Sequence, residues 1–310
     1  MDIMNTNAKT ATTPSTTANI THRAIVLACV DQSPYAAYVT DYAAWAAQRL
    51  NTGLELLHVI DRNPELGPEQ DHSGAIGFNE QENLLKKIVD EDEQRSRLAR
   101  ESGRVFLNEL KQRAEQKTAD HPLQVDVRQR HGALVDSLLE RHDHTTLVVM
   151  GRRGASSATT NRDLGRNLES VVRSMKCPIL SVTDEFKVPS HLMIAYDAGS
   201  ASRKGLDMVA NSPAFAGIRC SIVMVKDKES KEAPKQLEQA RQKLADAGLQ
   251  VDTHLLIGDF ESLMAKSIQT LGIDLLVMGA YTHSPWRSLF MGSHTTDLLR
   301  AARVPTLLLR

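Results

Sequence analysis

The sequence predicts an α/β protein built from two tandem, open, five-stranded parallel-sheet domains. Two observations lead to this prediction: short apolar runs alternate with longer helical stretches, and the order of these elements repeats in the second half of the chain. Alternating strands and helices are typical of a parallel sheet. A chain of 310 residues also exceeds what one ordinary core supports, so two domains of about 150 residues each are expected.

Ten apolar runs are the expected strands, five in each half and in corresponding order. In the first half they span 24–30, 54–60, 125–130, 147–150 and 179–182. In the second half they span 192–196, 221–225, 251–257, 275–278 and 306–309.

The spacing of matching residues indicates that the two halves arose by duplication. Asp31 precedes Val59 by 28 residues, and Asp197 precedes Val225 by the same 28. From the glycine after the fourth strand to the proline before the fifth, the distance is 27 residues in one half and 26 in the other. Agreement at several intervals is the pattern expected of an internal repeat.

One interval differs, and the difference locates an insertion in the first half. From Val59 to Gly132 the first half spans 73 residues, and from Val225 to Gly258 the second half spans 33. The extra segment begins with a loop at 62–68, rich in Pro and Gly, and continues as a charged helix over 79–118. Ser102-Gly103 is a candidate break. The pattern favours a lengthened crossover helix with a surface loop over a lid.

The boundary between the halves is expected at 184–190, directly after the fifth strand. This gives domains at 22–184 and 185–310, whose short connection favours close packing. Residues 1–21 are rich in Thr, Asn and Ala and lack the apolar core of a signal peptide, so they are predicted to be a disordered tail.

Composition excludes several classes of protein. The formal net charge is −1, whereas nucleic-acid-binding proteins usually carry a basic excess. No apolar run approaches the roughly 20 residues of a membrane helix. Three cysteines without metal-type spacing predict buried thiols in a reducing cytoplasm. His142-Asp143-His144 lacks a companion ligand and favours a solvated turn, so neither a metal site nor a set of catalytic residues is expected.

Each half also contains a strand that enters a glycine loop, which then opens a helix. Backbone N–H groups in such a loop can hold phosphate oxygens. The first copy places glycines at Gly151, Gly154 and Gly165. The second copy has Gly279, Thr282 and Gly292, with Ser293 after it.

An acidic turn follows the first strand of each half, at Asp31 and Asp197. In an open α/β sheet the ligand crevice lies beyond the carboxyl ends of the strands, where these carboxylates are placed. Each can accept a hydrogen bond from an adenine amino group or a ribose hydroxyl. Each can equally serve as an N-cap for the next helix, and the residues alone leave both interpretations open.

These motifs resemble the universal stress protein family. Its ATP-binding members carry Gly-x2-Gly-x9-Gly-(Ser/Thr) between the fourth strand and the last helix, and an Asp in a Val-Asp-x-Ser turn after the first strand. The resemblance covers residues 22–310, and the segments 177–182 and 304–309 are similar to the family's last strand. It implies two tandem domains of the adenine-nucleotide α-hydrolase-like, Rossmann-like kind.

The resemblance implies ATP or AMP as ligand, with Mg²⁺ accompanying ATP. In the second half the implied nucleotide-binding residues are Asp197, Val225, Gly279, Thr282, Gly292, Ser293 and Thr295. The matching first-half residues are Asp31, Val59, Gly151, Gly154 and Gly165.

Both copies depart from the family pattern. In the first, ten residues separate Gly154 from Gly165, and Arg166 stands where Ser or Thr is expected. In the second, the spacing and Gly292-Ser293 are kept, but Thr282 replaces a glycine. We therefore expect nucleotide mainly in the second half. The arginines of the first loop suit either a solvated surface or phosphate attraction; they are Arg152, Arg153, Arg162 and Arg166.

The expected function is a stress-response signalling or interaction module that binds adenine nucleotide. The alternatives are a scaffold of the same family without nucleotide, and a slow Mg²⁺-dependent ATPase, for which no residue identifies a dedicated catalytic base. In this family domains pair through their final strands, so 179–182 and 306–309 are expected to pair within the chain. Further assembly into a homodimer is compatible with the sequence.

Overall fold

The computed structural model describes residues 24–60, 78–152, 166–183, 185–279 and 304–309; at 78–89, 91, 92 and 166 it describes the backbone only. Within these residues, no helix combines the length and the apolar character needed to cross a membrane.

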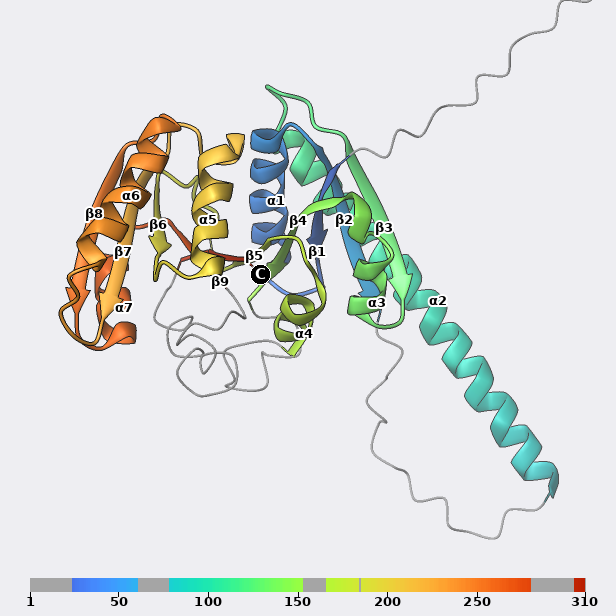
Figure 1. Ribbon diagram of the computed structural model, residues 1–310. Helices are drawn as coiled ribbons and strands as arrows, with labels where there is room; N and C mark the ends of the chain where they lie inside the picture. The colour runs from blue at the N-terminus through green and yellow to red at the C-terminus, as the bar shows by residue number, and fades with distance from the viewer. Residues whose placement is uncertain (1–23, 61–77, 153–165, 184, 280–303, 310) are drawn as a thin grey trace, which may run out of the picture.

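Ten strands form one sheet in the order β3-β2-β1-β4-β5-β10-β9-β6-β7-β8 (Figure 1). The strands of the first half are β1 (Ile25–Cys29), β2 (Gly53–Ile60), β3 (Val125–His131), β4 (Thr145–Gly151) and β5 (Ile179–Val182). Those of the second half are β6 (His191–Ala195), β7 (Arg219–Lys226), β8 (Val251–Ile257), β9 (Leu275–Gly279) and β10 (Thr306–Leu309). Within each half all pairings are parallel, and the order of the five strands is the same.

The two halves meet at the middle of the sheet, where β5 and β10 pair in the antiparallel direction. Thr306 lies opposite Ser181, and Leu307 lies opposite Leu180. Both strands are buried along their whole length. The last strand of each half therefore has its outer edge covered by the other, which leaves no exposed edge at this position.

Helices cover both faces of the sheet (Figure 1). They are α1 (Ala36–Leu50), α2 (Phe78–Lys117), α3 (Leu134–Leu139), α4 (Arg166–Ser174), α5 (Ser200–Asn211), α6 (Ala233–Asp246) and α7 (Phe260–Thr270). Helices α1, α2, α5 and α6 bury their apolar side chains in one core, and α3, α4 and α7 bury theirs in another.

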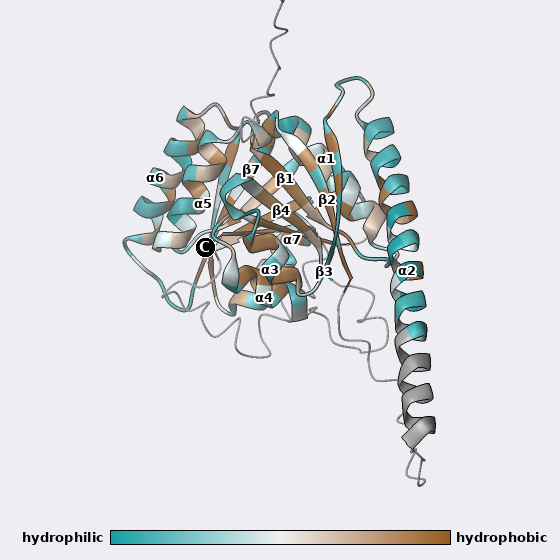
Figure 2. Cartoon of the chain, turned by 90° about the vertical axis from the view of Figure 1, so that its right-hand side faces the viewer, coloured by the Kyte–Doolittle hydropathy of each residue, from teal (hydrophilic) through white to brown (hydrophobic). Residues whose placement is uncertain are grey.

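Alternation along each strand supplies both cores, because successive side chains point to opposite faces of a sheet. On β1, Val26 and Ala28 belong to the core under α1, and Leu27 belongs to the core under α4. Figure 2 shows the consequence: the strands are mostly hydrophobic, whereas the outer faces of the helices are hydrophilic. The fold class expected from the sequence is confirmed, and all ten strand boundaries agree with the expected ones to within two residues.

The long helix α2 runs unbroken from Phe78 to Lys117, so the expectation of a break at Ser102-Gly103 was wrong. The glycine has a packing role instead. A Cβ at Gly103 would overlap the side-chain amide of Gln129 and lie 3.1 Å from Cδ2 of His58. Because glycine lacks this atom, the carboxyl-terminal part of α2 can cross closely over β2 and β3, whereas its amino-terminal part extends beyond the sheet (Figure 1).

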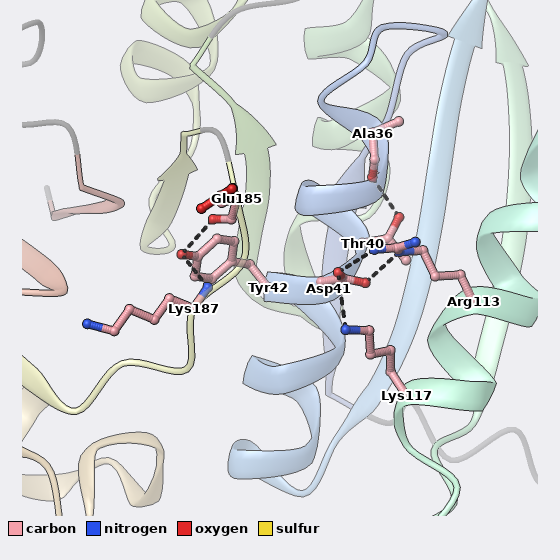
Figure 3. A network of polar contacts seen from close by, with 8 residues as sticks. All are labelled: Ala36, Thr40, Asp41, Tyr42, Arg113, Lys117, Glu185 and Lys187. Atoms are coloured by element: carbon pink, nitrogen blue, oxygen red, sulfur yellow. Dashed lines mark hydrogen bonds and ion pairs between the residues drawn. The ribbon is translucent and has the colours of Figure 1, made fainter.

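Polar contacts join α1 to its neighbours (Figure 3). The buried carboxylate of Asp41 accepts hydrogen bonds from Nε and Nη2 of Arg113, each at 2.7 Å. The next residue, Tyr42, holds the segment that connects the halves: its hydroxyl donates to the carbonyl of Glu185 (3.2 Å) and accepts from the N–H of Lys187 (3.3 Å). The connection is thus fixed to the first half by side-chain contacts.

Candidate functional site

The candidate site of the second half lies at the point of the sheet where the order of the strands reverses. Strand β6 has β7 on one side and β9 on the other. Ligands of open α/β sheets bind beyond the carboxyl ends of the strands at such a switch point. Three of the expected residues are gathered there: Asp197 follows β6, Val225 lies near the end of β7, and Gly279 ends β9.

Strand register places these residues at one edge. Ala195 is the partner of Val223, and the N–H of Tyr196 donates to the carbonyl of Val223 at 2.9 Å. The chain therefore brings Asp197 level with Val225. The side chain of Val225 is half-buried against the core under α7.

Asp197 organises the turn that leads into α5. Its Oδ1 accepts hydrogen bonds from the N–H of Gly199 at 2.8 Å and from the hydroxyl of Ser202 at 2.6 Å. The bond to the second residue along is an Asx turn. The N-cap residue of α5 is Gly199, so the N-cap interpretation of Asp197 is replaced by this turn. Ala198, inside it, has a φ of 64°, in the left-handed region that favours glycine.

Gly279 is required by packing. A Cβ at this position would lie 2.6 Å from Cβ of Ala201, in the first turn of α5. Real Cβ atoms do not approach this closely. The glycine therefore lets the start of α5 lie directly against the end of β9. This close packing fixes the relative positions of these two elements at the candidate site.

The first half repeats this arrangement. The N–H of Ser33 donates to Oδ1 of Asp31 at 3.2 Å, which forms the same Asx turn. Cys29 pairs with residues of both β2 and β4, so Asp31, Val59 and Gly151 lie at the carboxyl edge of the three strands.

The remaining expected residues lie outside the described part of the chain, and they are Gly154, Gly165, Thr282, Gly292, Ser293 and Thr295. The structure thus brings together three candidate residues in each half and does not place the phosphate loops. Among the described residues, no group of three or more His, Cys, Asp or Glu side chains could hold a metal ion.

Comparison with known proteins agrees with this architecture. The model of the universal stress protein family matches residues 23–183 and 221–310, which is most of the chain. The chain belongs to this family. A curated relative, universal stress protein Slr1230 of Synechocystis, is 31% identical over 287 residues, which are 92% of this chain and 99% of the relative. The match between this universal stress protein and that relative therefore includes both halves of the chain.

Solved structures show the same fold. A universal stress protein from Archaeoglobus fulgidus has a TM-score of 0.66 at 17% identity, covering 93% of this chain and 96% of its own. Two other solved structures match a shorter part of this chain. A universal stress protein in complex with cAMP is 16% identical and has a TM-score of 0.35, covering 40% of this chain and 98% of its own. A universal stress protein from Arabidopsis thaliana with AMP bound is 14% identical and has a TM-score of 0.32, covering 39% of this chain and 91% of its own.

One arginine of this universal stress protein has a role that the sequence did not indicate. Arg152, directly after Gly151, is buried, so of the two interpretations open for the loop arginines the solvated surface does not apply to it. Its Nη2 donates to the carbonyl of Val304 at 2.9 Å and to the hydroxyl of Thr306 at 3.2 Å. Arg152 thus connects the end of β4 to the start of β10 in the other half. Only the pairing of β5 with β10 could have indicated this contact.

Proposed function

We propose that this universal stress protein binds an adenine nucleotide, ATP or AMP, mainly in its second half, and acts as a stress-response signalling or interaction module. The observation that supports the proposal most directly is the repeated edge: an Asx-turn aspartate, a strand backbone and a glycine at the switch point of each half. Such an edge offers a carboxylate and backbone groups to a base and ribose.

In the proposed second site each residue has a separate task. The carboxylate of Asp197 accepts from the adenine amino group or a ribose hydroxyl, and the backbone of Val225 holds the base. Gly279 faces the ribose and phosphates. The phosphate-end residues are those of the loop and helix start, namely Thr282, Gly292, Ser293 and Thr295. When ATP is bound, Mg²⁺ would neutralise part of the phosphate charge.

The preference for the second half is supported by differences between the two loops. The hydroxyl expected after the last glycine is present as Ser293, whereas Arg166 replaces it in the first half. The first loop also begins with Arg152, whose guanidinium donates to Val304 and Thr306 of the second half. We therefore propose that the site at Asp31, Val59, Gly151, Gly154 and Gly165 is the weaker one.

Isothermal titration with ATP and AMP tests the proposal on the whole protein. Asp197→Asn keeps an oxygen for the Asx turn but removes the charge, so it separates ligand contact from turn formation. We expect it to weaken binding by about tenfold, the scale of one charged hydrogen bond. The matched variant Asp31→Asn should leave the main binding event unchanged. Equal losses in both variants would contradict the second-half preference, and no heat with the wild type would favour the nucleotide-free scaffold.

The slow-ATPase alternative needs its own measurement. Release of radiolabelled phosphate from ATP, with and without Mg²⁺, distinguishes a binder from an enzyme. Turnover that requires Mg²⁺ and is lost in Asp197→Asn would assign hydrolysis to the second site. Binding without turnover would leave a signalling module.

We further propose that the β5–β10 pair holds the two halves together in solution, in the way that two single domains pair in a dimer. Light scattering of the whole protein would show whether a homodimer forms in addition. Leu308→Pro changes a buried residue of β10 that lies opposite Ile179, and it would remove a backbone donor from the pair. We expect this variant to show two separate unfolding transitions in place of one.

A further inference from the structure

A cavity of about 160 Å³ lies between the two halves. Its floor is formed by matching leucines of the duplicated strands, Leu147 with Leu275 and Leu180 with Leu307. Leu147 and Leu275 belong to the amino-terminal parts of β4 and β9, whereas the candidate nucleotide edge lies at the carboxyl ends of the same strands. The cavity is therefore separate from the proposed nucleotide site.

Helical residues from both halves form the walls. Helix α1 contributes Trp45 and Ala46, helix α5 contributes Met208, and the 3₁₀ helix η3 (Pro213–Phe215) contributes Phe215. Beside these walls Arg49 joins the two halves, since its Nε donates to the carbonyl of Ala214 at 3.1 Å. The cavity thus exists only because the two halves are joined.

The lining is almost entirely apolar. Only two lining side chains carry hydroxyls, and both hydroxyls already have protein partners. Oγ1 of Thr146 donates to the carbonyl of Ile25 at 2.9 Å, and Oγ of Ser212 accepts from the N–H of Ala214 at 3.3 Å. The cavity is open to solvent on one side. A water molecule held against its apolar walls finds few of the two to four polar partners that it needs, so these walls favour an apolar occupant over water.

We propose that this cavity is a binding site for an uncharged apolar molecule of about the size of benzene, an aromatic ring or a short hydrocarbon. Its volume supports this size, because an enclosed cavity of about 150 Å³ with a similarly apolar lining binds benzene or xenon. An occupant would contact both halves at once. Since it binds only the joined state, its binding stabilises the packing of the two halves against each other.

Xenon and benzene are the probes for the experiment on the full-length protein. We expect a protein-dependent change in the ¹²⁹Xe chemical shift and a rise in Tm with benzene. Ala46→Leu and Ala214→Leu fill the cavity from opposite walls and should abolish both signals. Ala37→Leu is the matched control: the same change on α1, at a residue outside the lining. Circular dichroism verifies that each variant is folded.

No xenon or benzene signal with the wild type would overturn the proposal. Signals that persist in a folded Ala46→Leu or Ala214→Leu would also overturn it, because the probes would then bind elsewhere. Either filling variant is sufficient if the other fails to fold. The outcome is independent of nucleotide titration, so it stands or fails separately from the proposed function.

Discussion

Asp274 accepts hydrogen bonds from both the backbone N–H and the hydroxyl of Ser190, at 3.0 and 2.5 Å. The same buried carboxylate accepts from the N–H of His191 at 3.2 Å and pairs with the ammonium of Lys187. Asp274 lies just before β9, and Ser190 ends the segment that connects the halves. The connection is therefore held on one side by Tyr42 of α1 and on the other by this carboxylate.

Replacing Asp274 by alanine should destabilise the protein, because the N–H of the buried residue His191 would lose its partner. The expected loss is about 1–3 kcal/mol in the free energy of unfolding, the usual cost of an unsatisfied polar group. Urea denaturation measures it. An unchanged urea midpoint in Asp274→Ala would show that water replaces the carboxylate.

The same carboxylate predicts a pH dependence. Burial raises the pKa of Asp274, but the hydrogen bonds from Lys187 and Ser190 outweigh burial and lower the pKa below its ordinary value of 3.8. A lowered pKa in the folded state stabilises the protein above that ordinary value, and this contribution is lost as the pH falls through the folded pKa. As the pH falls from about 5 to about 2, the range in which Asp titrates, the free energy of unfolding should therefore decrease less in Asp274→Asn than in the wild type. Urea titrations at each pH measure this difference. Parallel curves would contradict this.

Gly279→Ala should destabilise the second half because its methyl would meet Cβ of Ala201. Overpacking of this kind costs about 1–3 kcal/mol, measured by urea denaturation. Gly53→Ala is the control, since a Cβ there meets its nearest neighbour at an ordinary 3.6 Å. The double variant Gly279→Ala, Ala201→Gly should recover part of the loss. An equal loss in the control would mean that any strand glycine responds in this way.

Ala198→Gly should stabilise the protein, because the left-handed backbone of Ala198 has a φ of 64°. That conformation costs an alanine about 1–2 kcal/mol, and the greater freedom of an unfolded glycine offsets part of the gain. We expect a rise of about 0.5–1 kcal/mol in the free energy of unfolding. Gly199→Ala should have the opposite effect, since its Cβ would lie 2.9 Å from Oδ1 of Asp197. A loss of stability in Ala198→Gly would show that the methyl group matters more for packing than for strain.

The three thiols should react slowly with a disulfide reagent in the folded protein. Burial raises the pKa of Cys29 and of Cys220 to about 12, and that of Cys177 to about 11. The thiolate is the reactive form, so at pH 8 each thiol is almost entirely protonated. Absorbance of the released chromophore should rise slowly in buffer and rapidly in urea. Fast reaction of one thiol in buffer would identify a local opening at that strand.

The sequence was sufficient for the strands because each is a short apolar run bounded by turn residues. It also located α2, whose charged, helix-favouring composition is distinctive. It could not show that Gly103 lies inside this helix without breaking it, since the reason is Gln129 on another element. The domain boundaries and the phosphate-loop residues stay predictions.

The candidate site was only partly predictable for the same reason. Asp31 and Asp197 could be placed at the carboxyl edge from strand order, but not assigned to Asx turns, because these depend on backbone angles. Arg152 was beyond reach, since its partners lie in the other half and more than 150 residues away.

The central β5–β10 pair has a consequence for stoichiometry. Two single domains that pair through the same edge separate on dilution and can exchange partners. Here the two edges belong to one chain, so the effective concentration of one edge at the other does not depend on the concentration of the protein. The two halves, which differ in sequence, are therefore always present in a ratio of one to one. A departure from the family pattern that lies in one half, such as Arg166 in the first or Thr282 in the second, is therefore always paired with a half that lacks it.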